Sequence, residues 1–339
     1  MVRLELLPYA VLRDRDDALA FQTRPNVRDD ALVSLLTCVV WEGSNRGSVP
    51  PKSSMSVYIF ELRIATISGA NQNSKGSCHM KMQLTFIGVG GAFTRKYYQS
   101  NMVLDVDGKR MLIDAGSDAR HALHALGMWY QDLHAVYISH LHADHAGGME
   151  WLSLATYFDP TFVDAAGAKR KLDLYLRSSL RDDLWDMLKG GCGIQNVKTG
   201  LRTFFNVHSL APNRPFKFNG VSFRTVQTVH FVNDTEIVPS FGLFWTAANG
   251  KKVFLTTDTQ FSPSSIQTFY NAADIIFHDC ETSPFRTGVH AHYEDMKKLP
   301  ADLKARMWLY HYFDTPLPDA KADGFAGFVQ QGQVFDLGE

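Results

Sequence analysis

Three histidines and one aspartate lie within six residues of the segment Ile138–Gly148, which reads ISHLHADHAGG. His140 and His142 follow a short apolar run, and their His-x-His spacing places two imidazoles on the same side of an extended chain. Asp144 and His145 come directly after them. Neutral imidazoles and carboxylates suit zinc or a similar divalent ion, and such sites serve reactions that need a metal-bound hydroxide near neutral pH. The segment therefore predicts a metal site with hydrolytic chemistry.

Three further residues of ligand type follow apolar, strand-like runs. His230 follows FRTVQTV, Asp258 follows KKVFLTT, and His311 follows RMWLY. A histidine-rich loop can arise by chance, and His-x-His alone is a weak signal. The additional candidates at the ends of other predicted strands strengthen the interpretation as a metal site.

The elements that must position these residues begin after about Met80. MQLTFIGVGGAF predicts a strand and a tight glycine turn, and the segment 101–116 predicts a hairpin with a two-residue Asp107-Gly108 turn. DARHALHALGMW is typical of a helix, and the strand AVYIS then leads into the histidine segment. Further strands with Asn-Gly turns follow. The pattern predicts a mostly antiparallel, sheet-rich α/β domain over residues 81–339.

Residues 1–80 have weak periodicity and end in the polar run SGANQNSKGSCHM. A run rich in glycine, serine and asparagine is typical of a linker. We therefore expect residues 1–80 to be an N-terminal extension of uncertain structure together with a linker.

Composition limits the class of protein. The 339 residues include 45% hydrophobic residues, enough for one large core, and the formal net charge of −1 provides no global basic field for nucleic acid. The apolar stretches are too short to cross a bilayer, no secretory signal stands out, and the four cysteines form no C-x-x-C pair. We expect a soluble cytoplasmic protein with free thiols.

The order H-x-H-x-D-H, then His, Asp and His, resembles the metallo-β-lactamase superfamily over residues 81–339. The resemblance implies an αββα sandwich with two bound divalent ions, zinc or alternatively manganese. It assigns one ion to His140, His142 and His230, the other to Asp144, His145 and His311, and a bridging position to Asp258. Asp114 matches the early aspartate of the family, which orients the histidine loop rather than binding metal.

The branch within the superfamily is indicated by other segments. Asp258 stands where zinc β-lactamases carry cysteine, which argues against antibiotic hydrolysis. LYHYF, at 309–313, and FHDCETSPFRTGVHAHYEDM, at 277–296, resemble the late His-Phe motif and the HEA and HST motifs of RNase Z-like phosphodiesterases. Carried over, Glu281 would orient His290 near the scissile phosphate. Ala291 and His292 replace Ser-Thr of that family, so His292 would share or take the role of His290.

The resemblance also implies a mechanism. Two metals would share a bridging hydroxide that attacks phosphorus in line, and Asp144 would hold that hydroxide. His290 would stabilise the developing charge or protonate the leaving ribose oxygen, and Glu281 would support its charge.

The substrate class follows from a short segment. Bacterial RNase Z enzymes insert a long basic arm between the third histidine and the bridging aspartate, where this chain has only residues 231–257. Together with DLWDMLKGG and GFAGFVQQGQVFDL, the motifs resemble phage and bacterial cyclic-nucleotide phosphodiesterases of the anti-Pycsar type. We expect hydrolysis of a small nucleotide phosphodiester, most simply a cyclic mononucleotide, with no membrane partner and with RNA less favoured.

Several alternatives stay open. The chain could process tRNA 3′ ends, open a lactone or thioester, or serve as a non-catalytic metal-binding module. The helix predicted at Ser178–Gly191 has either an exposed face or a subunit contact of a homodimer. The aromatic residues that follow the histidine loop favour core packing over a wall for a planar substrate; they are Trp151, Tyr157, Phe158 and Trp185.

Overall fold

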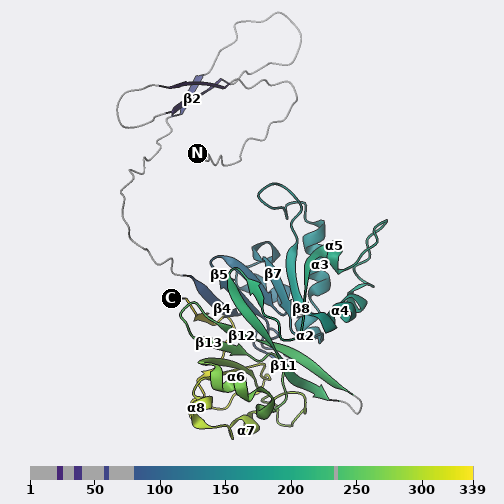
Figure 1. The fold of residues 1–339 in the computed structure, drawn as a ribbon, viewed down its shortest axis with the longest axis vertical. Coiled ribbons are helices and arrows are strands. Elements are labelled where there is room, and N and C mark those ends of the chain that lie inside the picture. Colours follow the sequence, from purple (N-terminus) through teal and green to yellow (C-terminus); the bar gives the residue numbers. More distant parts are fainter. Residues whose placement is uncertain (1–20, 26–33, 40–56, 61–79, 233–235, 339) are drawn as a thin grey trace, which may run out of the picture. The chain divides into compact units, whose positions relative to one another are not determined.

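The computed structural model describes residues 21–25, 34–39, 57–60, 80–232 and 236–338 (Figure 1). The chain divides into two compact units, Met1–Gly76 and Ser77–Glu339. In the described part of the first unit, β1 (Phe21–Pro25), β2 (Ser34–Val39) and β3 (Val57–Phe60) form an antiparallel sheet. Of the predicted linker, residues 68–80, all but Met80 lie outside the described residues. The division at residue 80 stays a prediction.

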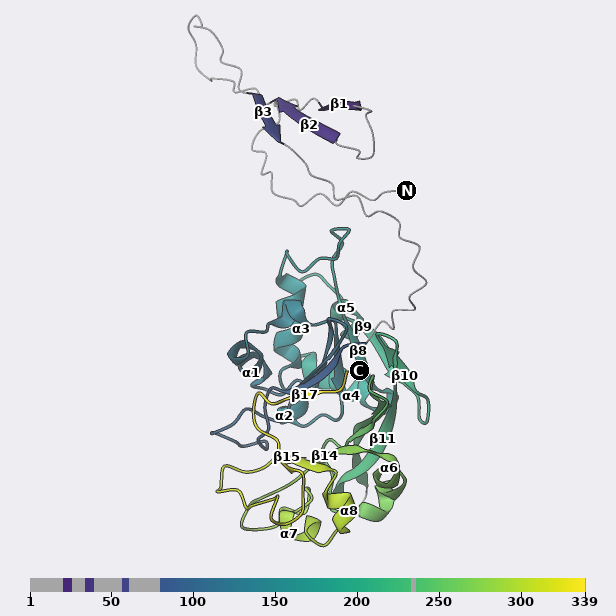
Figure 2. The same cartoon turned by 90° about the vertical axis from the view of Figure 1, so that its left-hand side faces the viewer.

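The second unit consists of two stacked sheets with helices on both outer faces (Figures 1 and 2). The first sheet has seven strands, in the order β17 (Val334–Asp336), β4 (Met82–Phe86), β5 (Met102–Val106), β6 (Lys109–Ile113), β7 (Ala135–Ile138), β8 (Leu172–Arg177) and β9 (Phe205–Leu210). The second also has seven, in the order β10 (Phe216–Phe218), β11 (Val221–Val232), β12 (Ile237–Thr246), β13 (Lys252–Leu255), β14 (Ile275–Asp279), β15 (Met307–Tyr310) and β16 (Gly327–Phe328).

The helices of the second unit lie in the connections between strands. They are α1 (Ala119–Ala125), α2 (Ala143–Ala146), α3 (Met149–Phe158), α4 (Arg181–Leu188), α5 (Leu201–Phe204), α6 (Gln267–Ala272), α7 (Tyr293–Met296) and α8 (Ala301–Lys304), with short 3-10 turns at Tyr130–Asp132, Ser178–Leu180 and Pro263–Ile266. No helix in the described ranges is long and apolar enough to cross a membrane. The four layers make the metallo-β-lactamase αββα sandwich.

Each sheet is antiparallel on one side and parallel on the other. Pairing is antiparallel from β17 through β6 and from β10 through β13, and parallel from β6 through β9 and from β13 through β16. The sheets are therefore mixed in equal parts rather than mostly antiparallel. Hairpin turns can be recognised in a sequence. Parallel strands are joined by long crossovers, and no local sequence signal shows how such strands pair.

Two predicted turns form as two-residue hairpin loops. Asp107 and Gly108 both have positive φ (49° and 77°) and connect paired Val106 and Lys109. Asn219 and Gly220 have φ of 40° and 87° at the β10–β11 turn. Positive φ at both positions suits the twist of a hairpin, which explains the Asp-Gly and Asn-Gly pairs.

Three apolar clusters fill the spaces between the four layers. The inner cluster joins the two sheets, as where the rings of Phe86 and Phe277 lie 5.1 Å apart. A second packs Met149 and Leu152 of α3 on the outer face of the first sheet, and a third packs Tyr270 of α6 on the second sheet. Each fully buried large side chain contributes about 1.5–3 kcal/mol, so these clusters hold the strand ends in fixed positions.

Candidate metal centre

The predicted ligands converge at the carboxyl ends of strands from both sheets. The loop after β7 carries His140 and His142, helix α2 carries Asp144 and His145, β11 carries His230, and Asp258 and His311 follow β13 and β15. Strand ends from two packed sheets thus meet at one edge of the sandwich. All seven side chains lie in two adjoining groups that could hold metal ions.

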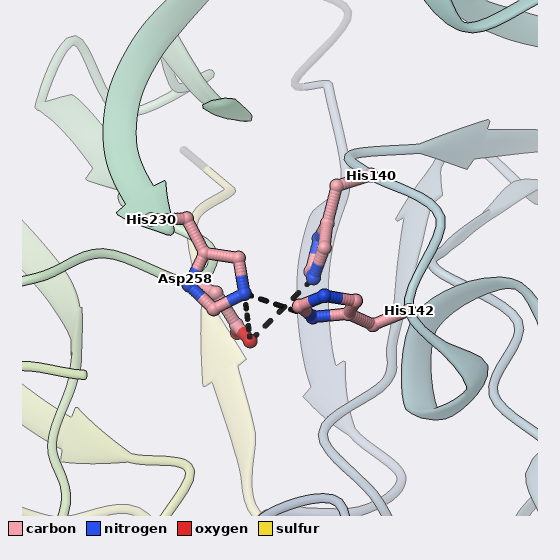
Figure 3. Close-up of side chains that lie close together, drawn as sticks. All are labelled: His140, His142, His230 and Asp258. Atoms are coloured by element: carbon pink, nitrogen blue, oxygen red, sulfur yellow. Dashed lines mark hydrogen bonds and ion pairs between the residues drawn. The ribbon is translucent and has the colours of Figure 1, made fainter. Parts of the chain in front are cut away.

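The first group contains His140, His142, His230 and Asp258, whose ligand atoms all lie within 4.8 Å of one another (Figure 3). His230 Nε2 lies 2.9 Å from His142 Nδ1 and 3.6 Å from Asp258 Oδ2. His140 Nε2 also lies 3.6 Å from that carboxylate oxygen. Ring nitrogens from three separate side chains therefore point toward one small volume beside a carboxylate.

The second group contains Asp144, His145, Asp258 and His311. Asp144 Oδ2 lies 3.2 Å from Nε2 of both His145 and His311. His145 Nε2 is also 3.2 Å from Asp258 Oδ1, and His311 Nε2 lies 3.6 Å from Asp258 Oδ2. Asp258 belongs to both groups, and its two oxygens together contact histidines of each, as a bridging ligand would.

The donor set fits a pair of cations. His140 Nε2, His145 Nε2 and both carboxylate oxygens of Asp258 are buried without a hydrogen-bond partner among the described residues. Buried polar atoms are nearly always paired, and leaving one unpaired costs about 1–3 kcal/mol. Unpaired nitrogens and oxygens aimed at common points are the ligand types of zinc and similar ions.

The electrostatics of the histidines match this arrangement. Burial lowers the pKa of His140 well below its usual value, and burial lowers the pKa of His230 to about 4 despite the opposing charge of Asp258. Both imidazoles are therefore neutral at pH 7, the form that ligates metal. Burial also lowers the pKa of His142.

The carboxylates favour a positive charge between them. Burial opposes ionisation of Asp258, yet His145 and His311 hold its pKa well below the usual range. Against the effect of burial, Asp258, Asp144 and Asp114 raise the pKa of His145 well above its usual value. A cation at this place compensates several buried negative charges at once.

Asp114 contacts the histidine loop, for which the resemblance implies an orienting role. Its carboxylate accepts hydrogen bonds from the Ser139 amide and hydroxyl, both at 2.7 Å, and lies 2.8 Å from His145 Nδ1. With His145 Nδ1 donating to Asp114, Nε2 is the ring nitrogen that points into the second group. The Ser139 hydroxyl also lies 2.9 Å from His140 Nδ1. Asp114 thus positions ligands without being one.

Two glycines allow the histidine loop to pack on the segment after β6. A Cβ atom at Gly116 would lie 2.2 Å from the Asp144 carbonyl oxygen, and one at Gly148 would lie 2.3 Å from the Gly116 carbonyl oxygen. The Ala115 amide donates to the His145 carbonyl at 2.7 Å. Close backbone contact of this kind explains why glycine stands two residues after Asp114 and at the last position of the histidine segment.

Three non-glycine residues of the site adopt positive φ: Asp114 (61°), Thr257 (53°) and His311 (65°). This conformation is unfavourable for side chains with Cβ and persists only where neighbours enforce it. The His311 amide donates to the Val89 carbonyl at 2.8 Å, and the Thr257 and Ser240 hydroxyls lie 2.7 Å apart. These contacts aim the adjoining ligands into the site.

His290 lies beside the metal-binding groups and is oriented by Asp279. Its Nδ1 lies 2.8 Å from Asp279 Oδ2, and its ring stacks on that of His311 with centroids 4.4 Å apart. Burial lowers the pKa of His290, but the charge and hydrogen bond of Asp279, together with the charges of Asp258 and Asp144, raise it to about 9. Asp279 is fully buried, and Thr259 donates its amide to the same carboxylate.

Sequence reasoning missed Asp279 and assigned its contact to Glu281. The Glu281 carboxylate instead accepts hydrogen bonds from the Ser283 hydroxyl and from Thr287, whose amide and hydroxyl lie 3.1 and 2.9 Å away. The Glu281 side chain therefore stabilises the loop that follows it, through Ser283 and Thr287. The signal was present: in FHDCE, Asp279 follows His278 at a strand end, as glutamate follows histidine in HEA.

The His292 side chain makes local contacts at the start of α7. It caps α7, where its Nδ1 accepts from the Glu294 amide at 3.3 Å, and its Nε2 lies 3.0 Å from the Ser283 carbonyl. Both ring nitrogens are therefore used by local backbone groups. The arrangement assigns the position next to the metal-binding groups to His290 and not to His292.

The comparison with protein families shows to which family the chain belongs. The family model described as anti-Pycsar protein Apyc1 matches residues 82–335. This chain belongs to that family. An anti-Pycsar protein Apyc1 from Paenibacillus sp. (strain J14) is 29% identical over 262 residues, covering 76% of this chain and 100% of that protein. Another, from Bacillus phage 010DV004, is 30% identical over 268 residues and covers 76% and 98%.

Solved structures agree on the fold. The metallo-β-lactamase fold protein YhfI from Bacillus subtilis has 18% identity and a TM-score of 0.58, over 76% of this chain and 99% of that one. A diphosphatase of the PhnP family has 17% identity and a TM-score of 0.59, over 77% and 98%. Human tRNase Z, short form, has 17% identity and a TM-score of 0.54, over 76% and 99%. With family membership and the two His/Asp groups, the chain is a metal-dependent hydrolase of the metallo-β-lactamase fold.

Proposed function

We propose that this Apyc1-family protein hydrolyses cyclic mononucleotides with two divalent ions, zinc or alternatively manganese. The observation that carries the proposal is the position of Asp258, shared by two ligand groups, with His290 stacked on a ligand of the second group. A bridged pair of cations beside a cationic imidazole suits a reaction in which negative charge builds up on a phosphoryl group.

In this proposal, His140, His142 and His230 would hold one ion, Asp144, His145 and His311 would hold the other, and Asp258 would contribute to both. When bound, the ions would neutralise the phosphoryl oxygens and lower the pKa of a water placed between them. Asp144 would accept a hydrogen bond from that attacking water and fix its direction toward phosphorus.

His290 would act on the leaving group. Its Nδ1 is committed to Asp279, so its Nε2 is the atom left to donate. As the water oxygen bonds to phosphorus, the bond from phosphorus to one ribose oxygen would break, and the proton of His290 would pass to that ribose oxygen. The water would keep one proton on the new phosphoryl oxygen and release the other to solvent, from which His290 would be protonated again. The product is a linear nucleoside monophosphate.

The connection between His230 and Asp258 supports a small substrate. It consists of the end of β11, then β12 and β13 within the second sheet, and only residues 233–235 of it lie outside the described structure. No segment is left over for an RNA-gripping arm, and the net charge of −1 gives no general attraction for tRNA. We therefore favour a mononucleotide over pre-tRNA, and a cytoplasmic location where such nucleotides occur.

The experiment is an activity panel on purified protein reconstituted with zinc or manganese. We expect turnover of 3′,5′-cyclic mononucleotides and weak or no action on pre-tRNA or a lactone. His290→Ala should slow cyclic-nucleotide hydrolysis about 10²-fold or more while both metals stay bound. His292→Ala is the matched control and should keep most of the activity. Cleavage of pre-tRNA without action on any cyclic mononucleotide would favour tRNA processing instead.

The salt dependence of turnover distinguishes cyclic-nucleotide hydrolysis from tRNA processing, independently of the activity panel. Binding through many phosphate contacts releases counterions, so pre-tRNA cleavage would fall steeply and log-linearly with salt. A cyclic mononucleotide carries one phosphate, and its turnover should change little between low and moderate salt. A steep salt dependence of cyclic-nucleotide turnover would contradict the proposal.

A further inference from the structure

The connection between β4 and β5 carries an unusual side chain. It projects from the body of the unit in Figure 2, and Phe93 on it is 91% exposed. Exposing a phenyl ring in this way forfeits about 1.5–3 kcal/mol that burial would provide. Phe93 has the largest exposed fraction among the large apolar side chains of the described residues.

The loop that presents Phe93 is held in place. The Asp314 carboxylate accepts hydrogen bonds from the Thr94 hydroxyl at 2.7 Å, the Arg95 amide at 2.8 Å and the Lys96 amide at 3.3 Å. The Thr94 hydroxyl in turn accepts from the Tyr97 amide at 3.0 Å. Phe93 is therefore held out in solvent by a built turn rather than by lack of structure.

Phe93 and Phe313 line a common cavity of about 310 Å³ together with the exposed Arg95. This volume lies at the small end of the range of ligand pockets. Two phenyl rings and a guanidinium can stack on a planar heteroaromatic ring.

The cavity adjoins the metal-binding groups. Gly91 lines it, and a Cβ atom at Gly91 would lie 3.5 Å from the ring of His311. The Gly91 amide donates to the Tyr312 carbonyl at 3.2 Å, so this segment runs alongside the strand end that carries the ligand. Phe313 comes two residues after His311. A phosphate held at the metals would place its attached nucleoside within reach of this cavity.

The aromatic residues singled out in the sequence do not offer such a surface. The ring of Trp151 packs 5.4 Å from that of Trp129, and the ring of Tyr157 packs 5.5 Å from that of Phe204, within the outer core of the first sheet. Phe158 is 64% exposed at the end of α3, so for it the expectation of core packing was wrong. It does not line the cavity and can serve as a matched control.

We propose that Phe93 and Phe313 form the subsite that stacks the nucleobase of the substrate. The proposal rests on the proposed function, because it takes the phosphate of a cyclic nucleotide to lie at the metals. Asp314, Thr94 and Thr315 use their side-chain oxygens in hydrogen bonds to neighbouring segments, so the proposal assigns binding of the base to stacking on the two phenyl rings. Every base has a π-face, and the subsite therefore accepts all four bases.

Steady-state kinetics of the metal-loaded protein test the subsite. Phe93→Ala should raise KM about tenfold for each of the four 3′,5′-cyclic mononucleotides and leave kcat within about twofold, the effect of removing one stacking partner. Phe93→Trp should restore KM. Phe158→Ala should match the wild type. A cyclic ribose phosphate lacking the base should show no difference between wild type and Phe93→Ala.

The outcomes distinguish this proposal from the proposed function. A wild-type protein that hydrolyses cyclic nucleotides, with Phe93→Ala equal to it, overturns the subsite alone. An equal loss on the base-free substrate overturns it as well. A fall in molar mass of Phe93→Ala by light scattering would mark Phe93 as a subunit contact and also overturn it. Inactivity of the wild type on every cyclic nucleotide would overturn the proposed function.

Discussion

Asp279 Oδ2 lies 2.8 Å from Nδ1 of His290, and the same residue places its Oδ1 3.5 Å from Nδ1 of His311. One buried carboxylate thus contacts both a predicted metal ligand and the histidine proposed to donate a proton. The bond to Asp279 fixes which nitrogen of His290 stays available, and its charge favours the protonated ring.

Asp279→Asn should therefore reduce kcat for cyclic nucleotides about 10²-fold, because His290 loses both its orientation and its support for positive charge. Glu281→Gln is the matched control, since Glu281 holds only its own loop through Ser283 and Thr287. The control should lower the melting temperature and keep kcat within about threefold. A larger loss of kcat in Glu281→Gln than in Asp279→Asn would reverse the assignment.

The bridging position of Asp258 predicts a distinctive metal stoichiometry. Asp258→Ala should reduce occupancy at both metal positions, because each group loses one of its oxygens. His142→Ala removes a ligand from the first group alone and should spare the other ion. Elemental analysis after reconstitution and desalting measures the metal bound per chain. Equal stoichiometry in the two variants would exclude a bridging role.

Gly116 should tolerate no side chain. A Cβ atom there would lie 2.2 Å from the Asp144 carbonyl, so Gly116→Ala should shift the histidine loop and destabilise the fold by roughly 1–3 kcal/mol or more. Gly190→Ala is the control, because Gly190 has open space around its Cβ position. Urea unfolding gives both values, and metal titration should show weaker binding only in Gly116→Ala. Similar stabilities of the two variants would contradict the packing described for the loop.

His134 should contribute to acid sensitivity away from the metal centre. Burial, followed by the charges of Lys109 and Arg170, lowers its pKa to about 4. Between pH 6.5 and 4 the unfolded chain then binds more protons than the folded chain, so the free energy of unfolding falls as pH falls through this window. His134→Gln removes this term. Between pH 7 and 5 the variant should lose less stability than the wild type.

The difference for His134 should be about 1 kcal/mol, because partial exposure of the side chain screens the effect. Urea unfolding of metal-free protein at both pH values measures it. An equal or greater loss of stability in His134→Gln would show that this histidine does not titrate as its surroundings indicate.

The predicted domain division is tested by truncation. The family match begins at residue 82, and the match to the Paenibacillus relative covers 76% of this chain and the whole of that protein. A chain of residues 80–339 should therefore retain the fold and most of the kcat/KM on cyclic nucleotides. Circular dichroism and activity of the truncated and full chains measure this. Aggregation, or a much lower melting temperature, would show that residues 1–79 belong to the core.

The candidate metal ligands were predictable because most of them lie at or shortly after the ends of recognisable apolar strands, and Asp144 and His145 lie in the same short segment as His140 and His142. His140, His142 and Asp144 are close in sequence, and hairpin turns such as Asp107-Gly108 revealed the register of nearby strands. Asp258 could be placed because a strand precedes it directly. Local sequence patterns were therefore sufficient to predict the candidate site and the fold class.

What the sequence did not reveal depends on contacts between distant segments. Which acid within FHDCE meets His290 depends on the path of the chain where β14 ends: Asp279 contacts His290, whereas the equally buried Glu281 contacts Thr287 of its own loop. The stacking cavity joins Phe93 to Phe313 across 220 residues of chain, and the Asp314 hydrogen bonds that shape it have no sequence signature. Parallel pairing of β13, β14 and β15 was also hidden, because no turn connects those strands directly.

The central claim, metal-dependent hydrolysis of a cyclic mononucleotide by attack of water on phosphorus, is tested most directly by ³¹P NMR in ¹⁸O-labelled water. Metal-loaded protein should convert a 3′,5′-cyclic mononucleotide to a linear monophosphate that carries the ¹⁸O shift on its phosphorus resonance. Protein treated with a chelator should leave the cyclic resonance unchanged. Persistence of the cyclic resonance with either zinc or manganese bound, or a linear product without the label, would contradict the account.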